Sequence, residues 1–96
     1  MVIRRSDLVD PKRLTRRFFD DNDPDIIGVE VMLDRHVLII MTMDQDGQTS
    51  VLFDVDAGQF AFDLAQLTAL FGQCDTDLSA WRQQLIQPGA LWERTI

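Results

Sequence analysis

The residues of this chain that could do chemistry are mainly aspartates, and they gather in short runs between apolar segments. The densest run covers residues 20–25 and reads Asp-Asp-Asn-Asp-Pro-Asp. Carboxylate oxygens are calcium ligands, so this run invites comparison with an EF-hand loop that starts at Asp21. The comparison fails, because Ile26 stands where that loop needs glycine and Met32 stands where it needs a bidentate glutamate. The pattern therefore predicts no metal site and no cofactor.

Candidate bases and nucleophiles are scarce in the rest of the chain. His36 is the only histidine, and although Asp34 lies two residues before it, no serine or cysteine motif supplies a nucleophile beside it. Catalysis needs a base, a reacting group and an orienting group within hydrogen-bond reach of one another. Cys74 is the only cysteine, and the acids near it would raise the pKa of its thiol and weaken it as a nucleophile. The sequence predicts no catalytic residue and a non-enzymatic protein.

Charge is spread unevenly along the 96 residues, whose formal net charge is −7. Residues 1–19 carry a net charge of +4, whereas residues 20–77 carry −12 with Arg35 as their only basic residue. An acidic body repels polyanions and attracts basic surfaces. The distribution favours a protein partner with a basic surface over nucleic acid.

The elements that would position these residues centre on an antiparallel meander within residues 26–62. Asp46-Gly47 is a strong hairpin signal between two apolar segments. The segment 37–43 is apolar on both faces, which is typical of an interior strand covered on both sides. The expected strands are residues 26–33, 37–43 and 48–55, with a short fourth strand at residues 59–62.

The N-terminal part of the chain carries a helix-start signal. Asp10 can cap a helix and Pro11 fits its first position, so we expect a helix over residues 11–19. Leu14 and Phe18 would lie on its apolar face. Its basic residues would either contact nucleic acid or acidic lipid, or be solvated or face acids of the body: Lys12, Arg13, Arg16 and Arg17.

Two further helices are expected after the meander. A capping box at Asp63 predicts a helix that ends at Gly72, and Asp75 predicts another helix that stops at Pro88. The predicted fold class is α+β, in a single domain over residues 1–96. It comprises an N-terminal helix, an antiparallel three- to four-stranded meander and two C-terminal helices packed on the sheet.

The meander would bring separate acidic runs together, because its first strand starts and its second strand ends at the same end of the sheet. The six acids expected there are Asp20, Asp21, Asp23, Asp25, Asp44 and Asp46. The opposite end would collect Asp34, Asp54 and Asp56 around Arg35 and His36. Aspartate is also common in turns for purely conformational reasons. The functional alternative is an acidic docking surface for a basic partner.

Apolar residues near the C-terminus exceed what a small sheet with one thin helical layer needs. The large ones are Trp81, Leu91 and Trp92, and tryptophan is favoured at recognition surfaces. Either they complete the core, or they stay exposed and indicate a homodimer or a groove for a partner.

With one cysteine, no signal-peptide pattern and no apolar run of about 20 residues, we expect a cytoplasmic protein. The predicted function is a non-enzymatic protein-binding module of the adaptor, chaperone, immunity or inhibitor type. In size, charge and mixed α/β content the chain is similar to small acidic secretion chaperones, immunity proteins and phage-encoded inhibitors. The alternative is a nucleic-acid-linked protein, which either mimics DNA through its acidic body or binds nucleic acid through its basic N-terminal helix.

Overall fold

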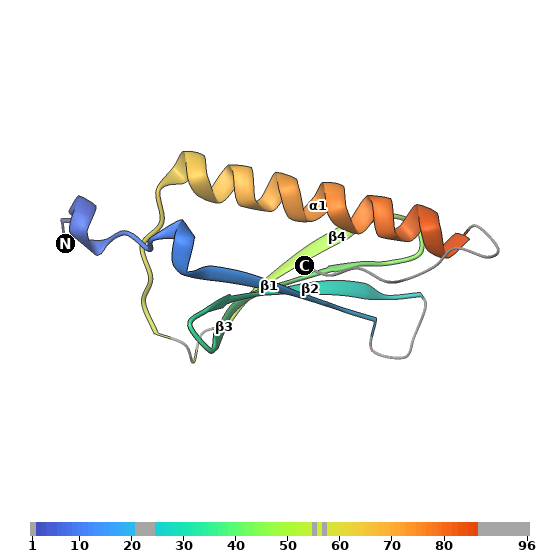
Figure 1. Cartoon of the computed structure of the whole chain (residues 1–96), viewed down its shortest axis with the longest axis horizontal. Helices are drawn as coiled ribbons and strands as arrows, with labels where there is room; N and C mark the ends of the chain where they lie inside the picture. Colours follow the sequence, from blue (N-terminus) through green and yellow to red (C-terminus); the bar gives the residue numbers. More distant parts are fainter. Residues whose placement is uncertain (1, 21–24, 55, 57, 87–96) are drawn as a thin grey trace.

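One long helix lies across one face of a four-stranded antiparallel sheet in the computed structural model of this chain (Figure 1). The structure describes residues 2–20, 25–54, 56 and 58–86. The strands lie in the order in which they follow one another along the chain: β1 (Leu14–Phe19), β2 (Ile27–Leu33), β3 (His36–Met43) and β4 (Thr49–Phe53). Helix α1 (Leu64–Ile86) comes last, and 3-10 turns at Arg5–Asp7 and Pro11–Arg13 precede the sheet. The α+β class and the antiparallel sheet are confirmed.

The centre of the sheet is the pair β2 and β3, whose alternate residues are apolar and align across the ladder. Ile27 lies opposite Met43 and Val29 lies opposite Met41, and all four side chains are buried. This matching of two apolar faces fixes the register, since a slip by one residue would turn every side chain to the other face. Gly47, with φ 86°, forms the turn into β4, as the hairpin signal predicts.

The predicted N-terminal helix over residues 11–19 is wrong. The cap exists, because the Asp10 carboxylate accepts a hydrogen bond from the Lys12 amide at 3.0 Å, but the 3-10 turn it begins ends at residue 13. The rest of the segment is β1, an edge strand paired with β2. Leu14 and Phe18 lie on one side of a strand as readily as on one face of a helix. Pairing with β2 then selects the strand over the helix, because a short isolated helix is only marginally stable in water.

The prediction of two C-terminal helices is also wrong, because α1 is one continuous helix. Its start is as predicted, since the Asp63 carboxylate accepts a hydrogen bond from the Gln66 amide at 3.0 Å. Gly72 does not end the helix, because the apolar stripe that packs on the sheet continues past this residue. The members of that stripe are Leu67, Leu70, Phe71, Cys74, Leu78 and Trp81. One helical glycine costs about 1 kcal/mol, which is less than the packing of such a stripe supplies.

Residues 59–62 form no strand, so the short fourth strand of the meander is wrong at this position. Ala61 instead makes an isolated parallel bridge with Leu8, and its carbonyl accepts a hydrogen bond from the Val9 amide at 2.8 Å. The fourth strand of the sheet is β1, which joins the meander on its other side, next to β2. The two edges of the sheet are therefore β1 and β4.

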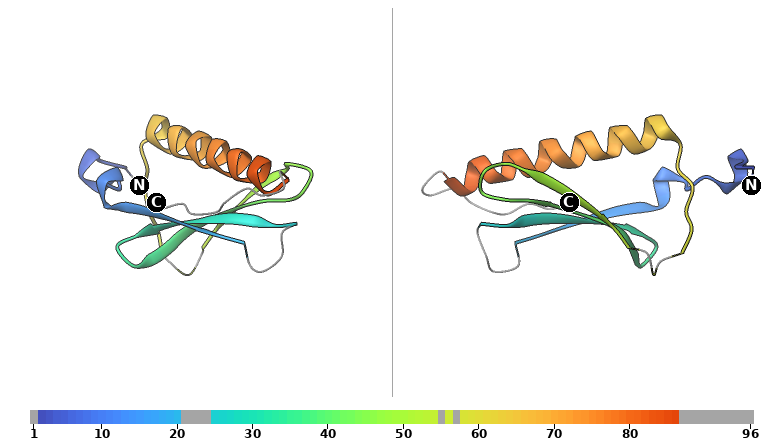
Figure 2. Two further views of the ribbon diagram at one scale, coloured as in Figure 1. Left: turned by 45° about the vertical axis from the view of Figure 1, so that its right-hand side comes forward. Right: turned by 180° about the vertical axis from the view of Figure 1, so that it is seen from behind.

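The hydrophobic core lies between α1 and the face of the sheet that is turned toward it (Figure 2). Cys74, Leu78 and Trp81 of α1 are buried there, and Phe18 of β1 meets Trp81 edge to face with 6.0 Å between the ring centroids. The apolar segment 37–43 predicts cover on both faces of its strand, but in the described part of the chain α1 covers one face only. On the opposite face, Ile40 is only half-buried. No helix of the described part has both the length and the apolar character needed to cross a membrane.

Candidate functional site

The edge strand β4 carries the most exposed apolar run of the sheet. The exposed fractions of Val51, Leu52 and Phe53 are 43%, 62% and 53%. The register turns Val51 and Phe53 toward the α1 side and Leu52 toward the open side, opposite Ile40. From Thr49 to Phe53 the strand has no charged residue and no proline. It therefore lacks the charged side chains and the proline that commonly keep a sheet edge from pairing with another chain.

Two hydrogen bonds mark the ends of the ladder between β3 and β4. At one end the Asp44 amide donates to the Gln48 carbonyl at 3.1 Å. At the other end the Asp54 amide donates to the Leu38 carbonyl at 2.9 Å. In an antiparallel ladder, residues that exchange hydrogen bonds with the neighbouring strand alternate with residues whose amides and carbonyls point away from it.

This alternation determines which backbone groups of β4 face solvent. Counted from either end of the ladder, Ser50 and Leu52 direct their amides and carbonyls toward β3. The amides and carbonyls of Thr49, Val51 and Phe53 point outward, where no further strand lies among the described residues. β4 therefore presents a row of backbone donors and acceptors beside its apolar side chains.

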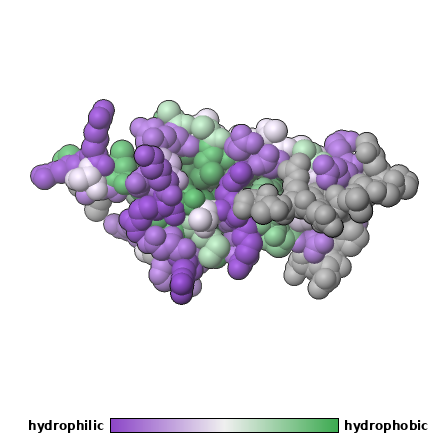
Figure 3. All heavy atoms as spheres, viewed as in Figure 1, coloured by the Kyte–Doolittle hydropathy of each residue, from purple (hydrophilic) through white to green (hydrophobic). Residues whose placement is uncertain are grey.

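The opposite edge, β1, is protected by charge. Arg16 and Arg17 stand in the middle of this strand. Charged side chains on an edge strand discourage pairing with another chain. Figure 3, drawn from the side where β1 lies in front, shows large hydrophilic areas interrupted by smaller hydrophobic ones. The two edges thus differ in kind, because β1 carries charged residues and β4 carries none.

Acidic turns lie at both ends of β4. Before the strand, the Asp44 carboxylate accepts hydrogen bonds from the amides of Asp46 and Gln48, both at 2.9 Å. After the strand, the Asp54 carboxylate accepts a hydrogen bond from the Asp56 amide at 2.9 Å. These bonds are the conformational role that aspartate commonly has in turns. The same side chains also place negative charge beside both ends of the exposed apolar run.

Four of the six acids predicted to share one end of the sheet lie in the described part of the chain: Asp20, Asp25, Asp44 and Asp46. Asp21 and Asp23 lie outside the described residues. The start of β2 and the end of β3 do lie at the same end, since Ile27 pairs with Met43. The topology therefore brings Asp25 and Asp44 to one end of the sheet.

Sequence reasoning missed a basic residue at this end. Arg82 of α1 is buried, and its Nη2 donates hydrogen bonds to the carbonyls of Asp25 and Met43, both at 2.9 Å. The available signal was its position four residues after Leu78 on the apolar stripe of α1. This cation ties the helix to the start of β2 and the end of β3, and it offsets part of the negative charge there.

At the opposite end of the sheet, a basic residue neutralises one of the three predicted acids. Asp34, with φ 57°, forms the turn between β2 and β3 and makes an ion pair with Arg13. His36 begins β3 and is exposed. Asp54 and Asp56 belong to the turn after β4 described above.

The four basic residues predicted on the N-terminal helix do not form a basic helix. Lys12 is exposed in the 3-10 turn, and the three arginines are spread over that turn and the two faces of β1. Each arginine pairs with an acid of the body: Arg13 with Asp34, Arg16 with Asp77 at 2.7 Å, and Arg17 with Glu30 at 2.9 Å. The hydrogen bond to Asp34 raises the pKa of Arg13. These contacts match the simpler alternative, in which the arginines pair with acids of the same chain.

The apolar residues predicted near the C-terminus are not the exposed surface of the described chain. Trp81 is only 7% exposed and packs in the core against Phe18. Leu91 and Trp92 lie outside the described residues. Among the described strands, the exposed large apolar side chains are those of Val51, Leu52 and Phe53 on β4.

Cys74 is buried in the core beside Arg16. Burial raises the pKa of the Cys74 thiol, and the hydrogen bond to Arg16 opposes part of that rise. Burial lowers the pKa of Arg16, but its hydrogen bonds to Asp77 and Cys74 outweigh this, so the pKa lies above its ordinary value. A buried, protonated thiol is a poor nucleophile. In the described residues, no three histidine, cysteine, aspartate or glutamate side chains are grouped so that they could hold a metal ion.

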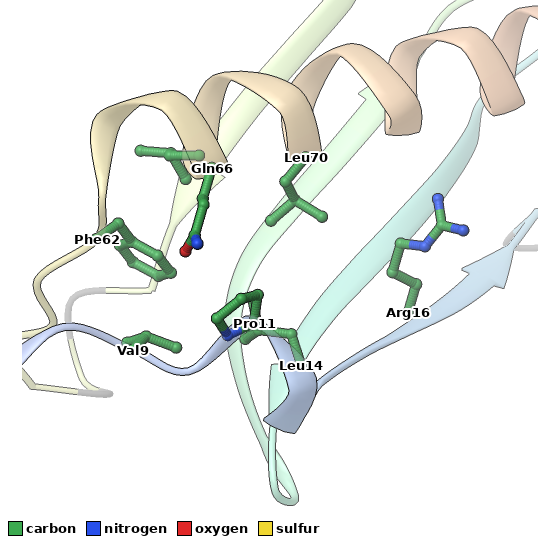
Figure 4. A pocket seen from close by; sticks show the side chains of 8 residues that line it. Val9, Pro11, Leu14, Arg16, Phe62, Gln66 and Leu70 are labelled. Atoms are coloured by element: carbon green, nitrogen blue, oxygen red, sulfur yellow. The ribbon is translucent and has the colours of Figure 1, made fainter.

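A small apolar pocket lies between the N-terminal segment and the first turns of α1 (Figure 4). Its volume is about 200 Å³, and its walls include Val9, Pro11, Leu14 and Phe62. Ligand pockets usually hold roughly 300–1,000 Å³. The one charged side chain among its lining residues, Arg16, is already paired with Asp77. This pocket therefore offers little to a small-molecule ligand.

A wider apolar hollow of about 450 Å³ lies beside the end of β4. Leu38, Phe53, Phe60 and Phe62 contribute to its walls, and Asp54 stands at its margin. Phe53 also meets Phe71 of α1 edge to face, with 6.2 Å between the ring centroids. The hollow extends the apolar surface of β4 toward α1.

Comparisons with protein-family models, with curated proteins and with solved structures found no match to this chain.

Proposed function

We propose that this protein is a non-enzymatic protein-binding module whose contact surface is the β4 surface. We define that surface as the apolar run Val51–Phe53 together with the acidic turns at its two ends. The observation that carries the proposal is that three consecutive apolar residues stay exposed on a sheet edge with no protecting charge. An exposed apolar edge strand in a soluble domain is a site of association with another chain.

The acidic turns give the proposed surface a preference among partners. Asp44 and Asp46 precede the apolar run, and Asp54 and Asp56 follow it. Negative charge around an apolar centre speeds association with a basic partner and rejects acidic ones. The predicted basic protein partner is therefore retained in the proposal.

Nucleic acid is the weaker candidate. Direct binding would rely on Lys12, Arg13, Arg16 and Arg17, and the three arginines are engaged with acids of the same chain. A polyanion would have to displace those acids and approach a chain of net charge −7. No specific observation favours the DNA-mimicking form either, so we propose neither.

Two matched variants test the proposal. Leu52→Glu places a charge in the β4 surface, whereas Leu64→Glu changes a residue that is 78% exposed at the start of α1. Affinity capture from the native host should recover a specific protein with the wild type and with Leu64→Glu, and should lose it with Leu52→Glu. Circular dichroism would establish that both variants are folded. Equal capture by all three proteins would contradict the proposed surface.

A further inference from the structure

We propose that the partner binds by adding a β-strand to β4, and that the added strand is an apolar segment flanked by basic residues from a different protein. This inference rests on the proposed function and specifies how the β4 surface makes contact and with what chemistry. Three features of β4 support it: the direction of its backbone groups, the apolar surface on both sides of the strand, and the charge at its ends.

The backbone of β4 is arranged to receive a strand. Thr49, Val51 and Phe53 direct their amides and carbonyls away from β3, and no described strand occupies the space beyond. In strand addition these main-chain groups supply much of the affinity, while pockets for alternate side chains supply specificity. No bulge interrupts the ladder between β3 and β4, so the outward groups form a regular row.

The apolar side chains around β4 favour an added strand that is itself apolar. On the α1 side, its residues would lie beside Val51 and Phe53 and reach the 450 Å³ hollow at the end of the strand. On the open side, they would lie beside Leu52, which is the most exposed of the three apolar residues of β4. Neighbouring side chains on adjacent strands contact one another directly, so apolar partners gain most at these positions.

The charge at the ends of β4 selects against a second copy of this chain. Two copies paired antiparallel about Val51 would bring Asp46 of each copy close to Asp54 and Asp56 of the other. Like charges placed together at both ends of the new ladder would oppose pairing. A strand with lysine or arginine at each end would instead meet opposite charge. The occupant we infer is therefore a basic-flanked segment of another protein.

A synthetic peptide pair provides the probe. One peptide has alternating valine and leucine with two lysines at each end, so that both of its faces are apolar, and the other has glutamates in place of the lysines. We expect the lysine peptide to bind about tenfold or more tightly than the glutamate peptide at low salt, with a difference that shrinks as salt is added. Equal binding of the two peptides would overturn the inferred charge selection.

Amide hydrogen exchange of the isotopically labelled full chain identifies the mode of contact. The lysine peptide should slow exchange at Val51 and Phe53, whose amides point outward, by about tenfold or more at saturation. It should change exchange little at Ser50 and Leu52, whose amides already bond to β3. A peptide with N-methyl groups at the residues facing β4 should not bind. Binding that leaves Val51 and Phe53 unprotected would overturn strand addition.

The outcomes separate this inference from the proposed function. If a captured partner is sensitive to Leu52→Glu but neither that partner nor the peptide protects Val51 and Phe53, the surface binds a protein in another way. Sedimentation of the wild type should show a monomer. A dimer that Leu52→Glu dissociates and Leu64→Glu does not would assign the β4 surface to a second copy of the chain and overturn the inferred partner.

Discussion

At Gly28 of β2, one added methyl group would clash with both neighbouring strands, β1 and β3. A Cβ atom at this position would overlap the ring of Phe19, which lies opposite on β1, and would lie 2.9 Å from the Met41 carbonyl oxygen. We expect Gly28→Ala to lower the free energy of unfolding by about 1–3 kcal/mol, as overpacking in an interior typically does. Urea denaturation monitored by circular dichroism measures this change.

A double-mutant cycle provides the control for Gly28. If the cost comes from the Phe19 ring, adding Gly28→Ala to the variant Phe19→Leu should cost less than adding it to the wild type. An unchanged unfolding free energy for the single variant would contradict the close approach of Phe19 to the Gly28 backbone.

At the level of elements, the continuity of α1 through Gly72 predicts that alanine there raises the free energy of unfolding, the opposite of its effect at Gly28. Nothing lies within 4 Å of a Cβ atom added at Gly72, and the residue is exposed in the middle of the helix. Gly72→Ala should therefore raise the free energy of unfolding by about 0.5–1 kcal/mol, because alanine loses less conformational entropy in a helix. The same denaturation experiment measures it.

The sign of the Gly72 result distinguishes the two arrangements of the C-terminal region. A glycine that ended a helix in the left-handed conformation would make alanine destabilising instead. A loss of stability in Gly72→Ala would thus contradict one continuous helix and favour the two shorter helices that capping signals predict.

The meander could be predicted from sequence because its signals are local. The Asp46-Gly47 turn and the alternation in residues 27–33 specify the hairpins without reference to the rest of the chain. The segment 14–19 could not be assigned in this way, since its apolar residues fit a helix and a strand equally well. Only its pairing with β2, which is a long-range contact, distinguishes the two.

In the C-terminal helix, local signals are present but misleading, because packing on the sheet overrides the residues that usually end and start a helix. Gly72 and Asp75 suggest an interruption, but the apolar stripe runs on through Cys74 and Leu78. The position of Cys74 on this stripe is the sequence signal that joins the two halves of the helix. Packing against the sheet outweighs the weak preference of single residues for a helix end.

For the whole molecule, the assignment of β1 determines which strands form the two edges of the sheet. If residues 11–19 were a helix, β2 would be an edge of the sheet, and the contrast between a charged edge and an apolar edge would not exist. With β1 in place, one edge carries Arg16 and Arg17, and the other carries Val51–Phe53. The acids of the turns and a strand over residues 48–55 could be predicted from sequence, but the position of that strand at an edge of the sheet could not.

The most direct test of the central claim is amide hydrogen exchange of the chain in complex with the protein it captures from its host. The β4 surface predicts slowed exchange at Val51 and Phe53 and unchanged exchange along β1, relative to the free chain. Protection confined to β1 or to the exposed side of α1, with Val51 and Phe53 unchanged, would contradict the assignment of β4 as the contact surface.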